Sequence, residues 1–137
     1  MKFSSRLPIA VHTLLVIEVF KGQYKITSDF IAGSVGVNPV IIRNILIQLK
    51  TANLVEVAAG IGGATLKKSP QEITLLDIFH AVEADESLFH IHEHPNPDCL
   101  VGRNINSILY THFDKIKKTV EQELNSITLQ SLLEQVK

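Results

Sequence analysis

The sequence predicts a mainly α-helical fold with one small β wing, a winged helix-turn-helix followed by a long helix. Three observations lead to this prediction. Two helical segments meet at a glycine between residues 28 and 52, a glycine-rich turn follows them, and apolar residues then recur every three or four positions from residue 103 to about residue 126. A chain of 137 residues with 45% apolar types is long enough to bury the core of one domain. We therefore expect one compact unit with an appended helix.

The compartment follows from what the sequence lacks. It has no run of about 18 apolar residues, which a membrane-spanning helix needs, and it does not begin like a secretory signal. Cys99 is the single cysteine, so a disulfide within the chain is impossible and a reducing compartment fits. We expect a soluble, cytoplasmic protein with no membrane partner.

Charge is divided unequally between the two halves. The net charge is −1, yet residues 1–68 carry eight Lys or Arg against three acids, and residues 69–137 carry five against eleven. Such segregation suits a half that faces nucleic acid joined to a half with another task, although two ordinary solvated surfaces would look the same.

The first helices can be located from their end signals. Residues 7–21 are apolar around most of a helix and should be buried. Ser28 is expected to cap a short helix ending at Gly36, and Asn38 followed by Pro39 should begin a second helix that reaches about residue 52.

Three residues in this pair have the spacing of a helix-turn-helix. A small residue, Ala32, lets the helices approach, Gly36 accepts a left-handed turn, and Ile42 packs between the helices. An ordinary corner between two helices can show the same spacing by chance.

A hairpin is expected directly after the second helix. Residues 54–59 are strand-like, residues 60–63 can turn sharply, and residues 65–68 can return as a second strand. This is the position of a wing. A phosphate-binding loop is disfavoured because no Lys-Ser or Lys-Thr pair follows the glycines.

The second half alternates helix, loop and helix. Thr74 should cap a helix that reaches about residue 84 and packs beneath the wing, and residues 85–102, with Pro95 and Pro97, should form an irregular loop. The long helix of residues 103–126 exceeds what the domain itself needs, and Thr128 begins a short last helix that can fold back as a clamp.

A long apolar stripe usually packs on a partner helix, and the simplest partner is a second copy of the same helix. The residues expected to form this dimer contact are Ile105, Ile108, Leu109, Phe113, Ile116 and Val120.

The second helix of the pair should present polar side chains for DNA. With its apolar face inside, the outward positions are Val40, Arg43, Asn44, Ile47 and Gln48. Arg43 can bond a guanine edge and Asn44 an adenine edge, although both also fit a plain solvated surface. Lys67 and Lys68, together with Lys2 or Arg6, would add attraction independent of base sequence. The expected DNA-binding set is Thr27, Ser28, Asn38, Pro39, Val40, Arg43, Asn44, Lys67 and Lys68.

The loop also carries residues that bind metals or react with oxidants. His90, His92, His94 and Cys99 have suitable ligand types, but their spacing matches no compact zinc site, so an exposed loop is favoured over a metal site. A redox role for Cys99 lies between these two interpretations, because nearby histidines or Arg103 would stabilise a thiolate. We find no catalytic arrangement and expect no enzyme.

Two stretches resemble a known family. Residues 31–83, above all GIGGATLKKSPQEITLLDIFHAVE, resemble the Rrf2-type winged-helix transcriptional regulators. HPNPDCLVGRNI, the long helix and SITLQSLL look like that family's sensor loop, dimerisation helix and closing helix. The resemblance implies a homodimer with crossed long helices that binds double-stranded DNA at a palindromic operator, with Arg43 at a base-reading position and the wing in the minor groove.

Two departures from the family pattern qualify this resemblance. Cluster-binding members have three close cysteines in the sensor loop, whereas this chain has only Cys99 and resembles the members without them. We therefore expect no cofactor and no iron–sulfur cluster. Ala59 stands where the family's wing often has an arginine, which shifts the wing's role toward Lys67 and Lys68.

Together these patterns predict a homodimeric repressor, redox-responsive through Cys99. Residues 1–84 would bind DNA, residues 85–102 would form a sensor-like loop, and residues 103–137 would dimerise. One alternative is a dimeric module that senses a metal or ligand and binds DNA weakly or not at all. Another is an effector-binding regulator without redox chemistry.

Overall fold

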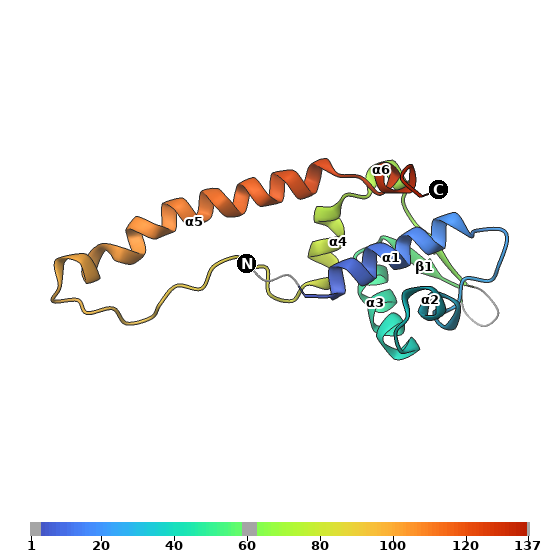
Figure 1. Cartoon of the computed structure of the whole chain (residues 1–137), viewed down its shortest axis with the longest axis horizontal. Helices are drawn as coiled ribbons and strands as arrows, with labels where there is room; N and C mark the ends of the chain where they lie inside the picture. Colours follow the sequence, from blue (N-terminus) through green and yellow to red (C-terminus); the bar gives the residue numbers. More distant parts are fainter. Residues whose placement is uncertain (1–3, 59–62, 137) are drawn as a thin grey trace.

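The computed structural model describes residues 4–58 and 63–136, in which a helical head bears a long projecting helix (Figure 1). The elements that form the head and the projection, in chain order, are α1 (Arg6–Val19), α2 (Ser28–Val35), α3 (Pro39–Thr51), β1 (Val55–Val57), β2 (Ala64–Leu66), the 3-10 helix η1 (Pro70–Glu72), α4 (Leu75–Val82), α5 (Leu100–Ser126) and α6 (Leu129–Leu133).

The core of the head is built around α1. Its residues Leu14 and Ile17 are fully buried, and the helix packs against α2, α3, α4, α6 and β2. Thr13 is the buried polar residue among the described residues, and its hydroxyl donates to the Ile9 carbonyl at 2.8 Å. The buried helix predicted for this segment is confirmed.

Side-chain caps set the starts of α2, α3 and α4. Asn38 accepts a bond from the Val40 amide at the start of α3, and Thr74 forms a capping box with Asp77 at the start of α4, both as predicted. The cap of α2 differs. Thr27, one residue before the predicted Ser28, accepts from the Phe30 amide because its extended backbone places the hydroxyl over the first turn.

The helix-turn-helix prediction is confirmed in detail. Gly36 ends α2 with a left-handed φ of 80°, and the directions of α2 and α3 differ by 112°. Ala32 and Ile42 are both buried where the two helices meet. The angle lies in the range typical of this motif.

The wing is a two-stranded antiparallel hairpin anchored to the start of α2. Val55 pairs with Leu66 and Val57 with Ala64, while the Ala64 amide donates to the Ile26 carbonyl at 2.8 Å. A Cβ on Gly63 would lie 2.6 Å from the Ile26 nitrogen, so only glycine allows this close approach. The predicted turn, including Ala59 and residues 60–62, lies outside the described residues.

Helix α5 begins three residues earlier than predicted, at Leu100, and the irregular segment before it, residues 83–99, is called the linker below. Figure 1 shows the linker running outward from the head to the far end of α5, and α5 leading back to the head. The predicted start was late because Pro95, Pro97 and Gly102 favoured a loop over residues 85–102, although Val101 lies four residues before Ile105 and extends the apolar stripe. Glycine at 102 is required, since a Cβ there would clash with the Asn96 carbonyl oxygen.

After α5 the chain returns to the head and closes it. Thr74 and Thr128 form an antiparallel bridge, the Leu129 amide donates to the Ile73 carbonyl at 2.7 Å, and Leu129 is fully buried. Thr128 caps α6 as predicted, and the expected clamp is present. The base of α5 is therefore fixed to the head.

No single helix within residues 4–58 and 63–136 is long and apolar enough to cross a membrane. Helices α2 and α3 are long and apolar enough only when they are taken as one segment, and that segment is bent by 112°.

Candidate nucleic-acid interface

One face of α3 is open to solvent. Ile42, Ile45 and Leu49 hold the opposite face in the core, and all three are fully buried. Several residues of α3 are exposed, among them Ile41, Lys50 and Thr51; the four that share one side of the helix, which we call the α3 reading face, are Val40, Arg43, Asn44 and Ile47.

Gln48, which the sequence places on the same outward side, belongs elsewhere. It is half-buried, and its Oε1 accepts a hydrogen bond from Nη2 of Arg6. Nε of Arg6 also donates to the Val82 carbonyl at 3.2 Å. Arg6 thus joins α1, α3 and α4, which takes it out of the set of expected phosphate contacts. Lys2, the other amino-terminal candidate, lies outside the described residues.

Arg43 projects from the middle of the reading face. Its side chain is 55% exposed, and Nη2 lies 3.9 Å from Oδ1 of Asp29 on α2. The separation is long and both groups are solvated, so this ion pair contributes little to stability. The guanidinium therefore remains available for a bidentate partner such as a guanine edge.

The helix starts expected to contact phosphates are already capped by their own side chains. Thr27 accepts from Phe30 at 3.1 Å, and Oδ1 of Asn38 accepts from Val40 at 2.9 Å. Pro39 has no amide hydrogen to donate. Because the oxygens of these two caps face backbone amides, the groups that remain for a phosphate are donors. They are the hydroxyl hydrogen of Thr27 and the NH₂ of Asn38.

A groove of about 460 Å³ runs between the start of α2, the reading face and the wing. It brings together Thr27, Ser28 and Arg43, three of the predicted residues, and adds Lys50. Lys50, in the last turn of α3, was not among the predicted residues. Its spacing of seven residues from Arg43 is the signal that would have found it.

The two wing lysines share one hollow, and Lys67 also lines a second one. Lys67 lines a hollow that includes Lys50, and its Nζ lies 3.4 Å from Oδ1 of Asn53. Lys67 and Lys68 both line another hollow on the side of α1, together with Lys21 and Glu18. Lys67 thus reaches both the hollow beside Lys50, which Glu56 also lines, and the hollow beside α1, whereas Lys68 lines the hollow beside α1.

The linker holds the candidate sensor residues without gathering them. His90, His92, His94 and Cys99 are all exposed, and in the described part of the chain they form no cluster that can hold a metal ion. Cys99 occupies the N-cap position of α5. The backbone amides of Gly102 and Val101 at that helix start lower the pKa of its thiol below the usual value.

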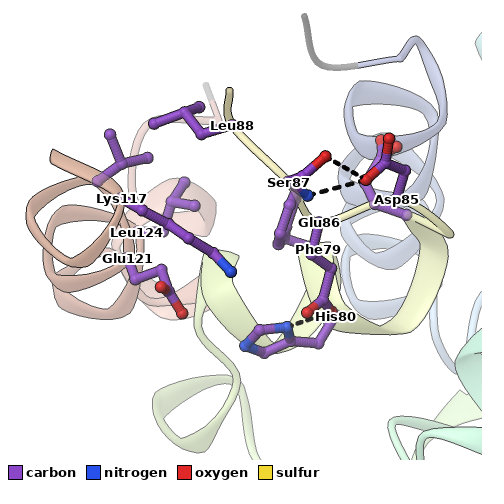
Figure 2. A pocket seen from close by; sticks show the side chains of 11 residues that line it. Phe79, His80, Asp85, Glu86, Ser87, Leu88, Lys117, Glu121 and Leu124 are labelled. Atoms are coloured by element: carbon purple, nitrogen blue, oxygen red, sulfur yellow. Dashed lines mark hydrogen bonds and ion pairs between the residues drawn. The ribbon is translucent and has the colours of Figure 1, made fainter. Parts of the chain in front are cut away.

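A small cavity lies between α4, the linker and α5 (Figure 2). Nδ1 of His80 meets Oε1 of Glu86 at 2.6 Å, and Lys117 and Glu121 approach from α5. The amide and hydroxyl of Ser87 donate to Asp85 and lower the pKa of that carboxyl. The enclosed volume of about 30 Å³ has room for water molecules rather than for an organic effector.

Comparisons with known proteins identify the family. The sequence profile of the Rrf2 family, described as iron-dependent transcriptional regulators, matches residues 3–135. The chain belongs to the Rrf2 family.

Individual relatives agree with this assignment. YwnA of Bacillus subtilis (strain 168), described as an HTH-type transcriptional regulator, is 40% identical over 130 residues, covering 95% of this chain and 96% of YwnA. A crystal structure described as that of a DNA-binding protein is 36% identical with a TM-score of 0.77, covering 94% of this chain and 99% of that one. CymR, the global cysteine regulator of B. subtilis, shares the fold at 22% identity and a TM-score of 0.71, covering 98% and 97%.

The chain is therefore a DNA-binding transcriptional regulator, and the winged helix-turn-helix fold with a long carboxy-terminal helix is confirmed. Because its relatives are regulators, the prediction that it is not an enzyme is confirmed as well.

The residues present do not fit the iron implied by the family's description. A cluster held by thiolates needs several ligands, whereas Cys99 is the single cysteine and is exposed. Within residues 4–58 and 63–136, Cys99 and the linker histidines form no group of three or more ligands that can hold a metal ion.

Proposed function

We propose that this Rrf2-family regulator is a homodimeric repressor that binds a palindromic operator. The observation that carries the proposal is the exposed reading face of α3, with Arg43 and Asn44 at its centre and a basic groove beside it. In a helix-turn-helix the second helix enters the major groove, where arginine pairs with guanine and asparagine with adenine. A dimer that covers both half-sites would deny polymerase an overlapping promoter.

The unpartnered stripe of α5 supports a homodimer. None of the 27 residues of this helix is buried, and Ile108 and Ile116 are 53% and 44% exposed. Phe113 stacks on Phe89 of the linker, and Val120 lines the cavity beside α4, so these two face their own chain. Ile105 and Leu109, both half-exposed, complete with Ile108 and Ile116 the stripe left for a second copy.

The position of Cys99 supports redox control. Its thiol is exposed at the start of α5, and the lowered pKa favours the thiolate. The thiolate would attack hydrogen peroxide, breaking the O–O bond to give a sulfenic acid while hydroxide leaves and takes up a proton. The sulfur is oxidised by two electrons and the peroxide is reduced to water. The extra oxygen at the helix start would alter how the linker and α5 pack in the dimer.

We further propose that the regulator acts without an iron–sulfur cluster or other cofactor. One thiolate per chain cannot supply the ligands of such a cluster. A free, reduced thiol also suits a cytoplasmic protein.

Replacement of Arg43 tests the DNA-binding proposal. The probe is a duplex selected by the wild-type protein from a random library, and binding is measured by fluorescence anisotropy at several salt concentrations. Arg43→Ala should weaken binding to this duplex by about 1–3 kcal/mol, because one bidentate base contact is lost. Binding to a shuffled duplex should change much less.

Arg103→Ala is the matched control, since it removes an exposed arginine from α5 rather than from the reading face. It should leave the affinity for both duplexes unchanged. Equal affinities of wild type and Arg43→Ala for the selected duplex would contradict the proposed role of Arg43 in base recognition.

A further inference from the structure

The reading face carries two large apolar side chains that the fold does not use. Val40 is 52% exposed and Ile47 is 62% exposed, whereas Ile41 is 39% exposed and Ile42 and Ile45 are fully buried. Residues 40, 43, 44 and 47 follow the spacing i, i+3, i+4, i+7, which places them on one side of the helix. Arg43 and Asn44 therefore lie between two β-branched apolar side chains.

This spacing matches the geometry of major-groove recognition. The homeodomain helix reads bases from four residues with the same i, i+3, i+4, i+7 pattern. In the major groove the apolar feature of a base pair is the 5-methyl group of thymine, which apolar side chains contact. A valine and an isoleucine at the outer positions suit that group and cannot form hydrogen bonds with the other base edges.

We propose that Val40 and Ile47 select thymine methyl groups on either side of the base pairs contacted by Arg43 and Asn44. The inference rests on the proposed function, in which α3 enters the major groove. Each operator half-site should then contain two thymines in the major groove, one toward the start of α3 and one toward its end.

The surrounding charge favours DNA over a protein as the occupant of this face. Residues 22–68, which contain α2, α3 and the wing, carry five Lys or Arg against two carboxylates. Ile47 lines the same groove as Arg43 and Lys50, so its apolar surface lies between cations. Cations that border an apolar contact suit a duplex, in which phosphates flank the base edges.

The test removes one methyl group at a time from each side of the contact. In the duplex selected by the wild-type protein, each thymine is replaced singly by deoxyuridine, which lacks only the 5-methyl group. Binding by wild type, Val40→Ala and Ile47→Ala is measured for every duplex. Ile91→Ala, which removes an exposed isoleucine from the linker, is the matched control.

We expect two thymines per half-site at which deoxyuridine weakens wild-type binding by about three- to fivefold, the effect of one buried methyl group. Ile47→Ala should abolish the loss at one of them and Val40→Ala at the other. Ile91→Ala should retain both losses. Because Val40 and Ile47 are exposed, neither substitution should disturb folding, which circular dichroism checks.

The outcomes separate this inference from the proposed function. If the wild-type protein selects a sequence but no deoxyuridine duplex binds more weakly, the inference is overturned while DNA recognition stands. Losses that persist in Val40→Ala and Ile47→Ala would also overturn it. A change of oligomeric state in Ile47→Ala would assign this face to a second copy instead. Failure to select any sequence would overturn the proposed function itself.

Discussion

At the scale of single residues, Arg43 and Asp29 show how the free protein can hold a base-reading side chain without locking it. Their 3.9 Å separation and high exposure make the pair weak, so the guanidinium exchanges Asp29 for a nucleic-acid partner at little cost. Asp29 also lies in the first turn of α2, where a carboxylate suits the positive end of the helix. Asp29 thus stabilises α2, which supports α3, and its carboxylate holds the guanidinium of Arg43 only loosely.

Cys99 should react at lower pH than an ordinary thiol. The amides of Gly102 and Val101 favour the thiolate, which lowers the pKa, and only the thiolate reacts. The rate of alkylation by iodoacetamide should therefore reach half its maximum at a lower pH than it does for free cysteine. A midpoint at or above that of free cysteine would contradict the proposed activation. Hydrogen peroxide should then change the affinity of the wild type for its selected duplex.

Cys99→Ser is the control for this response, because it preserves size and polarity but removes the oxidisable sulfur. It should bind DNA like the reduced wild type and ignore peroxide. An equal peroxide response in both proteins would show that Cys99 does not mediate the response.

At the scale of elements, the turn between α2 and α3 offers a matched pair of glycines. Gly36 has φ of 80°, whereas Gly33 lies inside α2, and an added Cβ meets no atom within 4 Å at either position. Gly36→Ala should destabilise the fold by about 1 kcal/mol, because an L residue is strained in the left-handed region. Gly33→Ala should stabilise it by about 0.5–1 kcal/mol, because alanine favours helix.

Urea denaturation followed by circular dichroism measures both effects. Because neither added methyl group meets another atom, the difference between the two variants reports backbone conformation alone. If Gly36→Ala were as stable as Gly33→Ala, the glycine would not be what shapes this turn.

Local signals in the sequence were sufficient for most elements. Asn38 and Pro39 located the start of α3, and Thr74 that of α4, because caps act within a few residues. Contacts between distant segments were not predictable in this way. Gln48 has the spacing of an outward residue, but Arg6, 42 positions earlier, holds it at the junction of three helices.

The candidate site was predicted in part. The outward positions of Arg43 and Asn44 follow from helical periodicity, which is a local property. That Lys67 lines a hollow with Lys50 as well as the one it shares with Lys68 depends on how the wing is anchored to Ile26, and no pattern in the sequence encodes that. The early start of α5 at Leu100 was also missed, because Gly102 and the nearby prolines favoured a loop there and the first turn is exposed rather than packed.

At the scale of the whole molecule, the two halves of the chain are connected by a rigid closure. The Thr74–Thr128 bridge and the buried Leu129 fix the end of α5 to the head, so the helix carries the head as a unit. A helix of 27 residues is about 40 Å long. When two such helices pair, the distance between the two reading faces is set by this geometry, as a palindrome requires.

Pairing through α5 should depend on its exposed stripe. Ile108→Lys combined with Ile116→Lys places charge in the proposed interface, so the double variant should sediment as a monomer. Val136→Lys, at an exposed apolar residue beyond α6, is the control and should remain a dimer.

The stoichiometry of the DNA complex tests the central claim most directly. Sedimentation equilibrium can count the chains bound to the full selected operator and to a duplex holding one half-site. We predict two chains per full operator and an affinity for the half-site lower by at least a factor of ten. One chain per operator, or equal affinity for the half-site duplex, would contradict the account of two heads paired by α5.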